Sequence, residues 1–150
     1  MNNEMTMQAF ASVVNDGIDL MNRRVYLSGD IDEDSISRTI RVVEFLDSIG
    51  TDPITLVVSS YGGDLDEAFA LHDVTRTVSC PIHAVALGKC MSAAPMLVAC
   101  GEKGQRYATQ HTSFMLHAVS LHGMDGSTVD QIQHTAKETQ QSVDDYISLL

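Results

Sequence analysis

The sequence predicts an α/β fold with a mostly parallel sheet, and three observations lead to this prediction. Short segments rich in apolar and β-branched residues alternate along the chain with longer segments of helical periodicity. The strand-like segments 54–60 and 82–87 are almost wholly apolar, which is usual for parallel strands covered on both faces. Strand, helix and strand follow one another repeatedly, the pattern of right-handed βαβ crossovers. With no repeat or linker, residues 1–150 are expected to form one domain.

The first half of the chain predicts two strands, each followed by a helix. Residues 1–20 are weakly patterned and are expected to form a flexible N-terminal segment. Residues 24–29 predict the first strand, and residues 32–49 a helix with acidic side chains in its first turn. A second strand over 54–60 leads through a glycine pair into a helix that extends to about Ser79. The expected apolar face of the first helix consists of Ile36, Ile40, Val43, Phe45, Leu46 and Ile49.

The second half predicts a third strand, a short helix, two short strands and a long final helix. The third strand, 82–87, leads into a helix that begins at Ser92 and ends at Gly101. Residues 106–108 and 113–117 are short and strand-like. The final helix over 127–150, which Ser127 would cap, has an apolar stripe: Val129, Ile132, Ala136, Val143, Ile147 and Leu150. This stripe packs either on its own domain or against a second copy of the chain.

Composition excludes several classes of function. The formal net charge is −11, with 20 acidic against 9 basic residues, so neither nucleic acid nor an anionic membrane is expected as a partner. No apolar run approaches the length of a membrane span, and the first residues lack the pattern of a signal peptide, so a cytoplasmic protein is expected. The three cysteines are expected to be buried and reduced. No motif indicates a metal or another cofactor.

Ser92, at the junction between the third strand and the short helix, has two interpretations. The simpler one is a helix N-cap, with Pro95 in the first turn where its missing N–H costs nothing. The alternative is a nucleophile beside backbone N–H groups that would stabilise an oxyanion. The stretch 88–101 alone does not decide between them.

Two further segments bear on this choice. Gly62 and Gly63 follow one buried strand and Ser92 follows the next, so both turns are expected at the same edge of the sheet, where α/β proteins bind ligands. A glycine pair lets a backbone N–H face a ligand without a side chain in the way, although it is also typical of a simple tight turn. His117 ends a short strand and could reach the same edge as a general base, or it could be structural.

These segments, taken in order, resemble the proteolytic subunit of the Clp protease (ClpP). Residues 59–63, Ser-Ser-Tyr-Gly-Gly, stand in place of the family's Asn-Ser-Pro-Gly-Gly turn. Residues 88–93 and 97–106 match its Gly-x-Ala-Ala-Ser-Met segment and the Leu-Leu-Ala-x-Gly-x-Lys-Gly-x-Arg run that follows. Residues 115–119 stand in place of its Met-Ile-His-Gln-Pro. The resemblance covers about residues 21–150 and implies a ClpP/crotonase-like fold with a protruding C-terminal handle helix.

The resemblance also implies the chemistry of a serine endopeptidase without a cofactor. Ser92 would be the nucleophile and His117 the general base, while the backbone N–H groups of Gly63 and Ala93 would form the oxyanion hole. Two residues would contact the substrate: Tyr61 and Gly62. The family's orienting aspartate has no counterpart up to Leu150, so the triad aspartate is not present in the chain.

The resemblance also predicts how the protein assembles, and the sequence departs from the family motifs at three places. The resemblance implies a homo-oligomer of heptameric rings, stacked through the 127–150 handle as a tetradecamer, that receives unfolded polypeptides from an AAA+ unfoldase. Tyr61 replaces proline, Ala93 replaces methionine, and Ala118-Val119 replaces Gln-Pro. Two alternatives stay open: a catalytically weak or inactive structural subunit of the same fold, and an acyl-CoA enzyme of the crotonase type.

Overall fold

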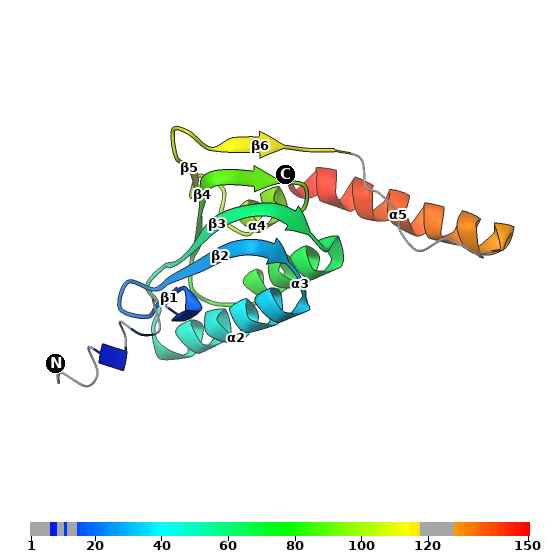
Figure 1. Cartoon of the computed structure of the whole chain (residues 1–150). Helices are drawn as coiled ribbons and strands as arrows, with labels where there is room; N and C mark the ends of the chain where they lie inside the picture. The colour runs from blue at the N-terminus through cyan, green and yellow to red at the C-terminus, as the bar shows by residue number, and fades with distance from the viewer. Residues whose placement is uncertain (1–6, 9–10, 12–14, 118–127) are drawn as a thin grey trace. The chain divides into compact units, whose positions relative to one another are not determined.

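The computed structural model describes residues 7–8, 11, 15–117 and 128–150, and the chain divides into two compact units, residues 1–115 and 116–150. The first unit is built on one sheet, in the order β1-β2-β3-β4-β5, with β6 also paired to β4 (Figure 1). Among the strands of the described residues, only β1 runs antiparallel to its neighbour. The strands are β1 Ile18–Asp19, β2 Arg24–Ile31, β3 Ile54–Gly63, β4 Ile82–Met91, β5 Arg106–Ala108 and β6 Ser113–Met115.

Three helices connect and cover these strands: α2 Glu33–Ile49, α3 Leu65–Thr75 and α4 Ala94–Ala99. The helices α2 and α3 lie side by side below the sheet in Figure 1, and α4 packs on β3 and β4. Inward-facing residues of neighbouring parallel strands pair in register, for example Leu56 with Ala84 and Val58 with Ala86, and all four are fully buried. The predicted α/β fold with a mostly parallel sheet is therefore confirmed.

The helix α2 illustrates how the local sequence sets an element's limits. The Asp32 carboxylate accepts a hydrogen bond from the Ser35 N–H at 2.8 Å, and the Ser35 hydroxyl accepts one from the Asp32 N–H at 3.1 Å, which forms a capping box. Ile36, Val43 and Leu46 are buried as predicted. Two members of the predicted apolar face, Phe45 and Ile49, are instead exposed at 50% and 58%. The side of α2 that packs against the rest of the protein is narrower than the set of apolar positions in its sequence.

Arg23 ties together the amino-terminal ends of three strands. It precedes β2 with a left-handed backbone, at φ +50°. Its guanidinium donates to the carbonyl oxygens of Asp52 and Gly50, just before β3, and to the sulfur of Cys80, just before β4. The thiol of Cys80 in turn donates to the Gly50 carbonyl at 2.9 Å. These contacts fasten the start of β2, β3 and β4 to one another.

The second unit contains α5, Val129–Leu149. Thr128 caps it together with Gln131 in a capping box, whereas the sequence pointed to Ser127, which lies outside the described residues. The apolar side chains of Val129, Ile132, Ile147 and Leu150 are exposed. Within the described ranges, no helix combines the length and apolarity needed to cross a membrane.

The three cysteines are free and buried, as the sequence predicts. Burial raises the pKa of both Cys90 and Cys100 to about 12. Their thiols are therefore protonated at neutral pH, and neither is an activated nucleophile.

Candidate active site

The candidate site is built where β3 and β4 end. Ser92 directly follows β4, and its backbone is left-handed, at φ +56°. Of the two interpretations of Ser92, the helix N-cap is wrong: the N-cap of α4 is Ala93, which makes no side-chain cap hydrogen bond. The physical reason is that the chain turns through Ser92 before the helix begins, which shifts the helix start by one residue. Pro95 lies within the first turn, as predicted.

The conformation of Ser92 is costly and is held in place by its neighbours. Among the described residues, only Arg23 and Ser92 are non-glycine residues with positive φ. Such a conformation costs about 1–3 kcal/mol and persists where the surrounding structure enforces it. Here the Ser92 N–H donates to the Met115 carbonyl at 2.8 Å, and Met91 pairs with Met115 at the end of the β4–β6 ladder.

The glycine turn at the end of β3 lies directly against Ser92. Gly62 has φ +110°, and a Cβ placed on it would lie 2.5 Å from Ser92 Cβ and 2.8 Å from the Met91 carbonyl oxygen. Its distance to the Ala93 backbone nitrogen would be 3.1 Å. Only glycine fits such a position, so the structure brings together the two turns that the sequence placed at one edge of the sheet.

Gly63, the next residue, lies equally close to β2. Its φ is +150°, and a Cβ there would overlap the Ile31 backbone. The Asp64 N–H donates to the Ile31 carbonyl at 2.8 Å, and the Asp64 carboxylate accepts from the N–H groups of Asp66 and Glu67 to cap α3. The turn is therefore clamped between β2 on one side and Ser92 on the other.

Ser60 is part of this turn, although no sequence pattern considered above predicted a role for it. Its side chain is 1% exposed, and its hydroxyl contacts the Gly29 carbonyl at 2.5 Å and the Gly62 N–H at 2.9 Å. The available sequence signal was a serine two residues before a glycine pair, a spacing typical of hydroxyl-stabilised turns.

Tyr61, a predicted substrate-binding residue, points away from the core. Its side chain is 66% exposed, and the Lys89 ammonium lies 4.7 Å from the centre of its ring, a cation–π contact. The Tyr61 ring therefore lies on the surface next to Gly62 in the chain. The proline that the family motif has at this position is a smaller side chain.

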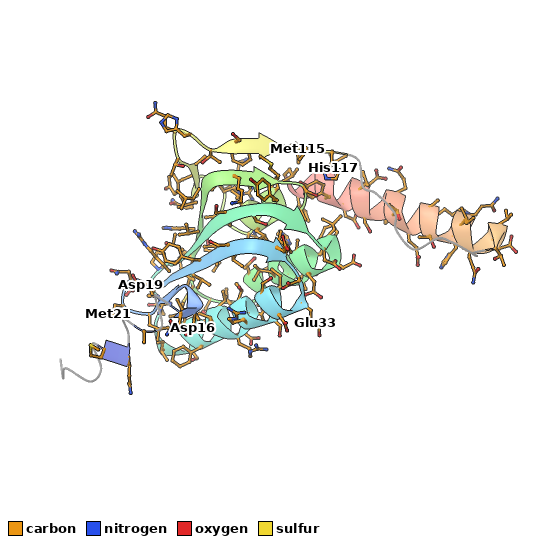
Figure 2. All side chains as sticks on the ribbon, viewed as in Figure 1. Asp16, Asp19, Met21, Glu33, Met115 and His117 are labelled. Atoms are coloured by element: carbon orange, nitrogen blue, oxygen red, sulfur yellow. The ribbon has the colours of Figure 1, made fainter. Side chains whose placement is uncertain are left out.

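His117 lies two residues beyond β6, in the second compact unit, and its side chain is exposed (Figure 2). Its pairing with Ser92 stays a prediction. The two residues after it, which depart from the family motif, lie outside the described residues.

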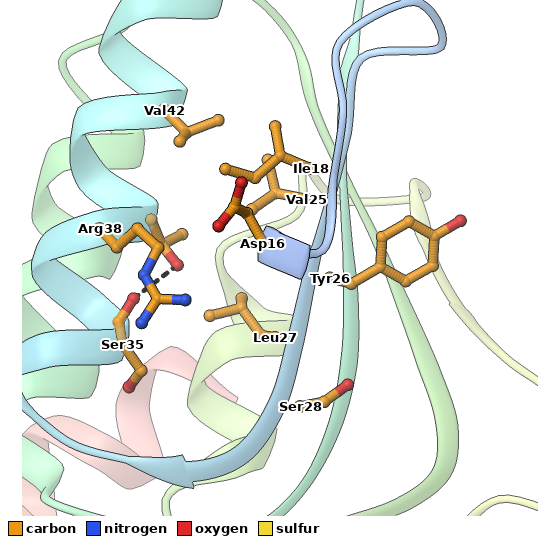
Figure 3. Close-up of a pocket in the computed structure, with 10 residues that line it drawn as sticks. Asp16, Ile18, Val25, Tyr26, Leu27, Ser28, Ser35, Arg38 and Val42 are labelled. Atoms are coloured by element: carbon orange, nitrogen blue, oxygen red, sulfur yellow. Dashed lines mark hydrogen bonds between the residues drawn. The ribbon is translucent and has the colours of Figure 1, made fainter. Parts of the chain in front are cut away.

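Other parts of the first unit do not add to this site. A cavity of about 100 Å³ lies between β2 and α2, lined by residues such as Val25, Leu27, Arg38 and Thr39 (Figure 3). Neither Ser92 nor the glycine pair lines it. Across the described ranges, no cluster of three or more His, Cys, Asp or Glu residues is arranged to hold a metal ion.

The fold and the site define an α/β protein with a mostly parallel sheet and a candidate active site at the carboxyl edge of that sheet. Comparison with known proteins identifies its family. Residues 11–149 match the Clp protease family, so the chain belongs to that family. It is 32% identical over 122 residues to the "ATP-dependent Clp protease proteolytic subunit 1" of Protochlamydia amoebophila, covering 79% of this chain and 58% of that protein. The resemblance stated above is thereby confirmed.

A further relative and a solved structure can be compared with the chain. The "ATP-dependent Clp protease proteolytic subunit 2" of Treponema pallidum is 31% identical over 124 residues, which cover 82% of this chain and 61% of that protein. A solved structure of a ClpP1 mutant from Listeria monocytogenes superposes with a TM-score of 0.76 at 23% identity, covering 86% of this chain and 72% of that one. This likeness shows the fold. The chain spans about three fifths of the length of the two curated relatives.

Proposed function

We propose that the chain is a serine endopeptidase subunit that cleaves unfolded polypeptides. The observation that carries this proposal is the left-handed Ser92 at the end of β4, packed against a glycine turn that admits no side chain. Strained backbone of this kind concentrates at functional sites, because it fixes a reactive group in one direction. Membership of the Clp protease family supports the same chemistry.

In the proposed reaction, the Ser92 hydroxyl attacks the carbonyl carbon of the scissile peptide bond. His117 accepts the hydroxyl proton and then passes it to the leaving amine, which departs as the C–N bond breaks. The resulting acyl-enzyme is hydrolysed by water, activated by the same imidazole. Ordinarily a third group orients the histidine, and losing it costs about 10⁴ in kcat while residual catalysis remains.

The oxyanion would be held by the N–H groups of Gly63 and Ala93. Ala93 follows the nucleophile, and its nitrogen lies beside Gly62. Asp64 donates its own N–H to Ile31 of β2. The Gly63 N–H is the second donor proposed, because the turn that carries it lies between β2 and Ser92. Removing one oxyanion donor typically lowers kcat by about 10²–10³.

The proposal extends to assembly. By analogy with the relatives named as subunits of an ATP-dependent protease, we propose homo-oligomeric rings, heptameric and stacked as a tetradecamer, with a Clp ATPase as the unfoldase. The exposed apolar side chains of α5 support its role as the handle between rings, since such a face is usually covered in an assembly.

A fluorophosphonate probe tests the chemistry directly, because it phosphonylates only an activated serine. The wild-type chain should gain one adduct at Ser92, found by peptide mass spectrometry, and Ser92→Ala should gain none. His117→Ala should react at least about 10²-fold more slowly, as expected for loss of a general base. A wild-type chain that stays unlabelled would refute the catalytic proposal and favour a structural subunit of the same fold.

A further inference from the structure

We infer that Ser60 is a positioning residue of this site: its hydroxyl holds the glycine turn, and with it the oxyanion-binding amide, against Ser92. The inference rests on the proposed function for its catalytic consequence, but the contacts that carry it belong to the structure of the turn itself. Ser60 touches no substrate atom in this scheme and acts only through its neighbours in the chain.

The first step is the hydrogen bonding of the Ser60 hydroxyl. Its single hydrogen goes to the Gly29 carbonyl, at 2.5 Å, and its oxygen accepts the Gly62 N–H, at 2.9 Å. The alternative acceptor, the Gly62 carbonyl, is farther away at 3.4 Å. With the side chain 1% exposed, water cannot readily replace either bond. The hydroxyl therefore bridges β2 and the glycine turn.

The second step is the position of this bridge within the sheet. The β2–β3 ladder is regular up to the pair of Ser28 with Ser59 and resumes at Asp30 with Gly62. One residue of β2 thus faces two of β3, which is a β-bulge, and ordinary ladder bonds are interrupted there. The Ser60 hydroxyl supplies a bond to the carbonyl of Gly29, the very residue that the register skips.

The third step links the bulge to the nucleophile. Gly62, whose N–H the hydroxyl fixes, packs against Ser92 Cβ and the Ala93 nitrogen so closely that no Cβ could be added. Its φ of +110° is open to glycine but rarely to a residue with a side chain, so the turn depends on Gly62 at this point. Without the hydroxyl, the Gly62 N–H and the Gly29 carbonyl would both lack this partner, and the turn would be free to move relative to Ser92.

The experiment compares Ser60→Ala with a matched control, Thr39→Val. Thr39 is also buried, and its hydroxyl donates to the Ser35 carbonyl within α2, so the control loses a buried hydroxyl bond outside the proposed site. The rate constant for fluorophosphonate reaction at saturating probe and the half-saturating probe concentration are measured for each folded variant. Hydrogen exchange of the segment 59–64 is followed by mass spectrometry.

We expect Ser60→Ala to lower the saturating rate constant about 10- to 100-fold, as for a misplacement of roughly 1 Å, with little change in the half-saturating concentration. Exchange of segment 59–64 should accelerate in this variant only. Ser60→Cys, with a weaker hydrogen-bonding group, should fall between Ser60→Ala and the wild type, and it takes the place of Ser60→Ala should the latter not fold. The control should react at the wild-type rate.

Two results would overturn the inference: a Ser60→Ala variant that reacts at the wild-type rate, or an equal slowing in Thr39→Val. If the wild-type chain itself does not react, the proposed function fails, and the exchange measurement alone decides the role of Ser60. Faster exchange in Ser60→Ala than in Thr39→Val then supports a positioning role in the turn, and unchanged exchange refutes it.

Discussion

Replacing Gly62 by alanine measures how tightly the glycine turn is held against Ser92. The added Cβ would lie 2.5 Å from Ser92 Cβ and 2.8 Å from the Met91 carbonyl oxygen, both well inside normal contact. Overpacking of this kind costs about 1–3 kcal/mol. The positive φ adds about 1–2 kcal/mol for a residue with a side chain. We therefore expect a loss of about 2–5 kcal/mol from a total stability of about 5–15 kcal/mol.

The control for this variant is Gly104→Ala. Gly104 also has a positive φ, +86°, but a Cβ there would meet nothing within 4 Å. It should lose only the backbone contribution of about 1–2 kcal/mol. Urea denaturation of the two variants and the wild type gives each free energy of unfolding from its midpoint and slope. Equal losses in the two variants would show that the turn moves away from Ser92 at little cost, contrary to the close packing described here.

Two further predictions concern titratable groups. Hydrogen bonds from Cys80 and Ser79 lower the pKa of the Asp47 carboxyl below its ordinary value of 3.8. The ionised carboxylate therefore stabilises the folded protein above pH 3.8, and this stabilisation is lost as the pH falls through the lowered pKa. Asp47→Asn should therefore destabilise the protein at pH 7, and the difference from wild type in urea midpoints should shrink below pH 4; a difference that grows in acid would contradict this. Burial raises the pKa of Cys90 and Cys100 to about 12, so iodoacetamide at pH 7.5 should leave both unmodified in the native protein and alkylate both in urea. Rapid native alkylation of either thiol would show that it is accessible.

The sequence predicted the parts of the fold that depend on periodicity. The apolar strands around Leu56 and Ala84 and the helix beginning after Asp32 have strong local signals, and the structure has all three. The predicted strand ends at residues 60 and 87 were wrong, because pairing with neighbouring strands continues to Gly63 and Met91. The exposure of Phe45 was not predictable in this way, because a single apolar side chain beside a buried stripe looks the same in sequence whether or not another element covers it.

The site was predicted less completely than the fold. The meeting of Gly62 with Ser92 followed from topology, since consecutive parallel strands end at one edge. The left-handed backbone of Ser92 could not be predicted from the sequence, because a serine before a helix most often adopts the extended N-cap conformation. The role of Ser60 depends on a bulge between β2 and β3, and a bulge is a property of strand pairing rather than of either strand alone.

The clamp made by Arg23 has a consequence for how the sheet tolerates irregularity. Strands β2, β3 and β4 are locked in alignment at their starting ends, and both of their register shifts, after Ser28 and after Val58, come later along the strands. Because the Arg23 contacts hold the strand starts in register, a register shift between two strands affects only the residues that follow it. The clamp therefore lies at the opposite ends of the strands from the glycine turn and Ser92, and the irregular pairing is confined to the half that carries the candidate site.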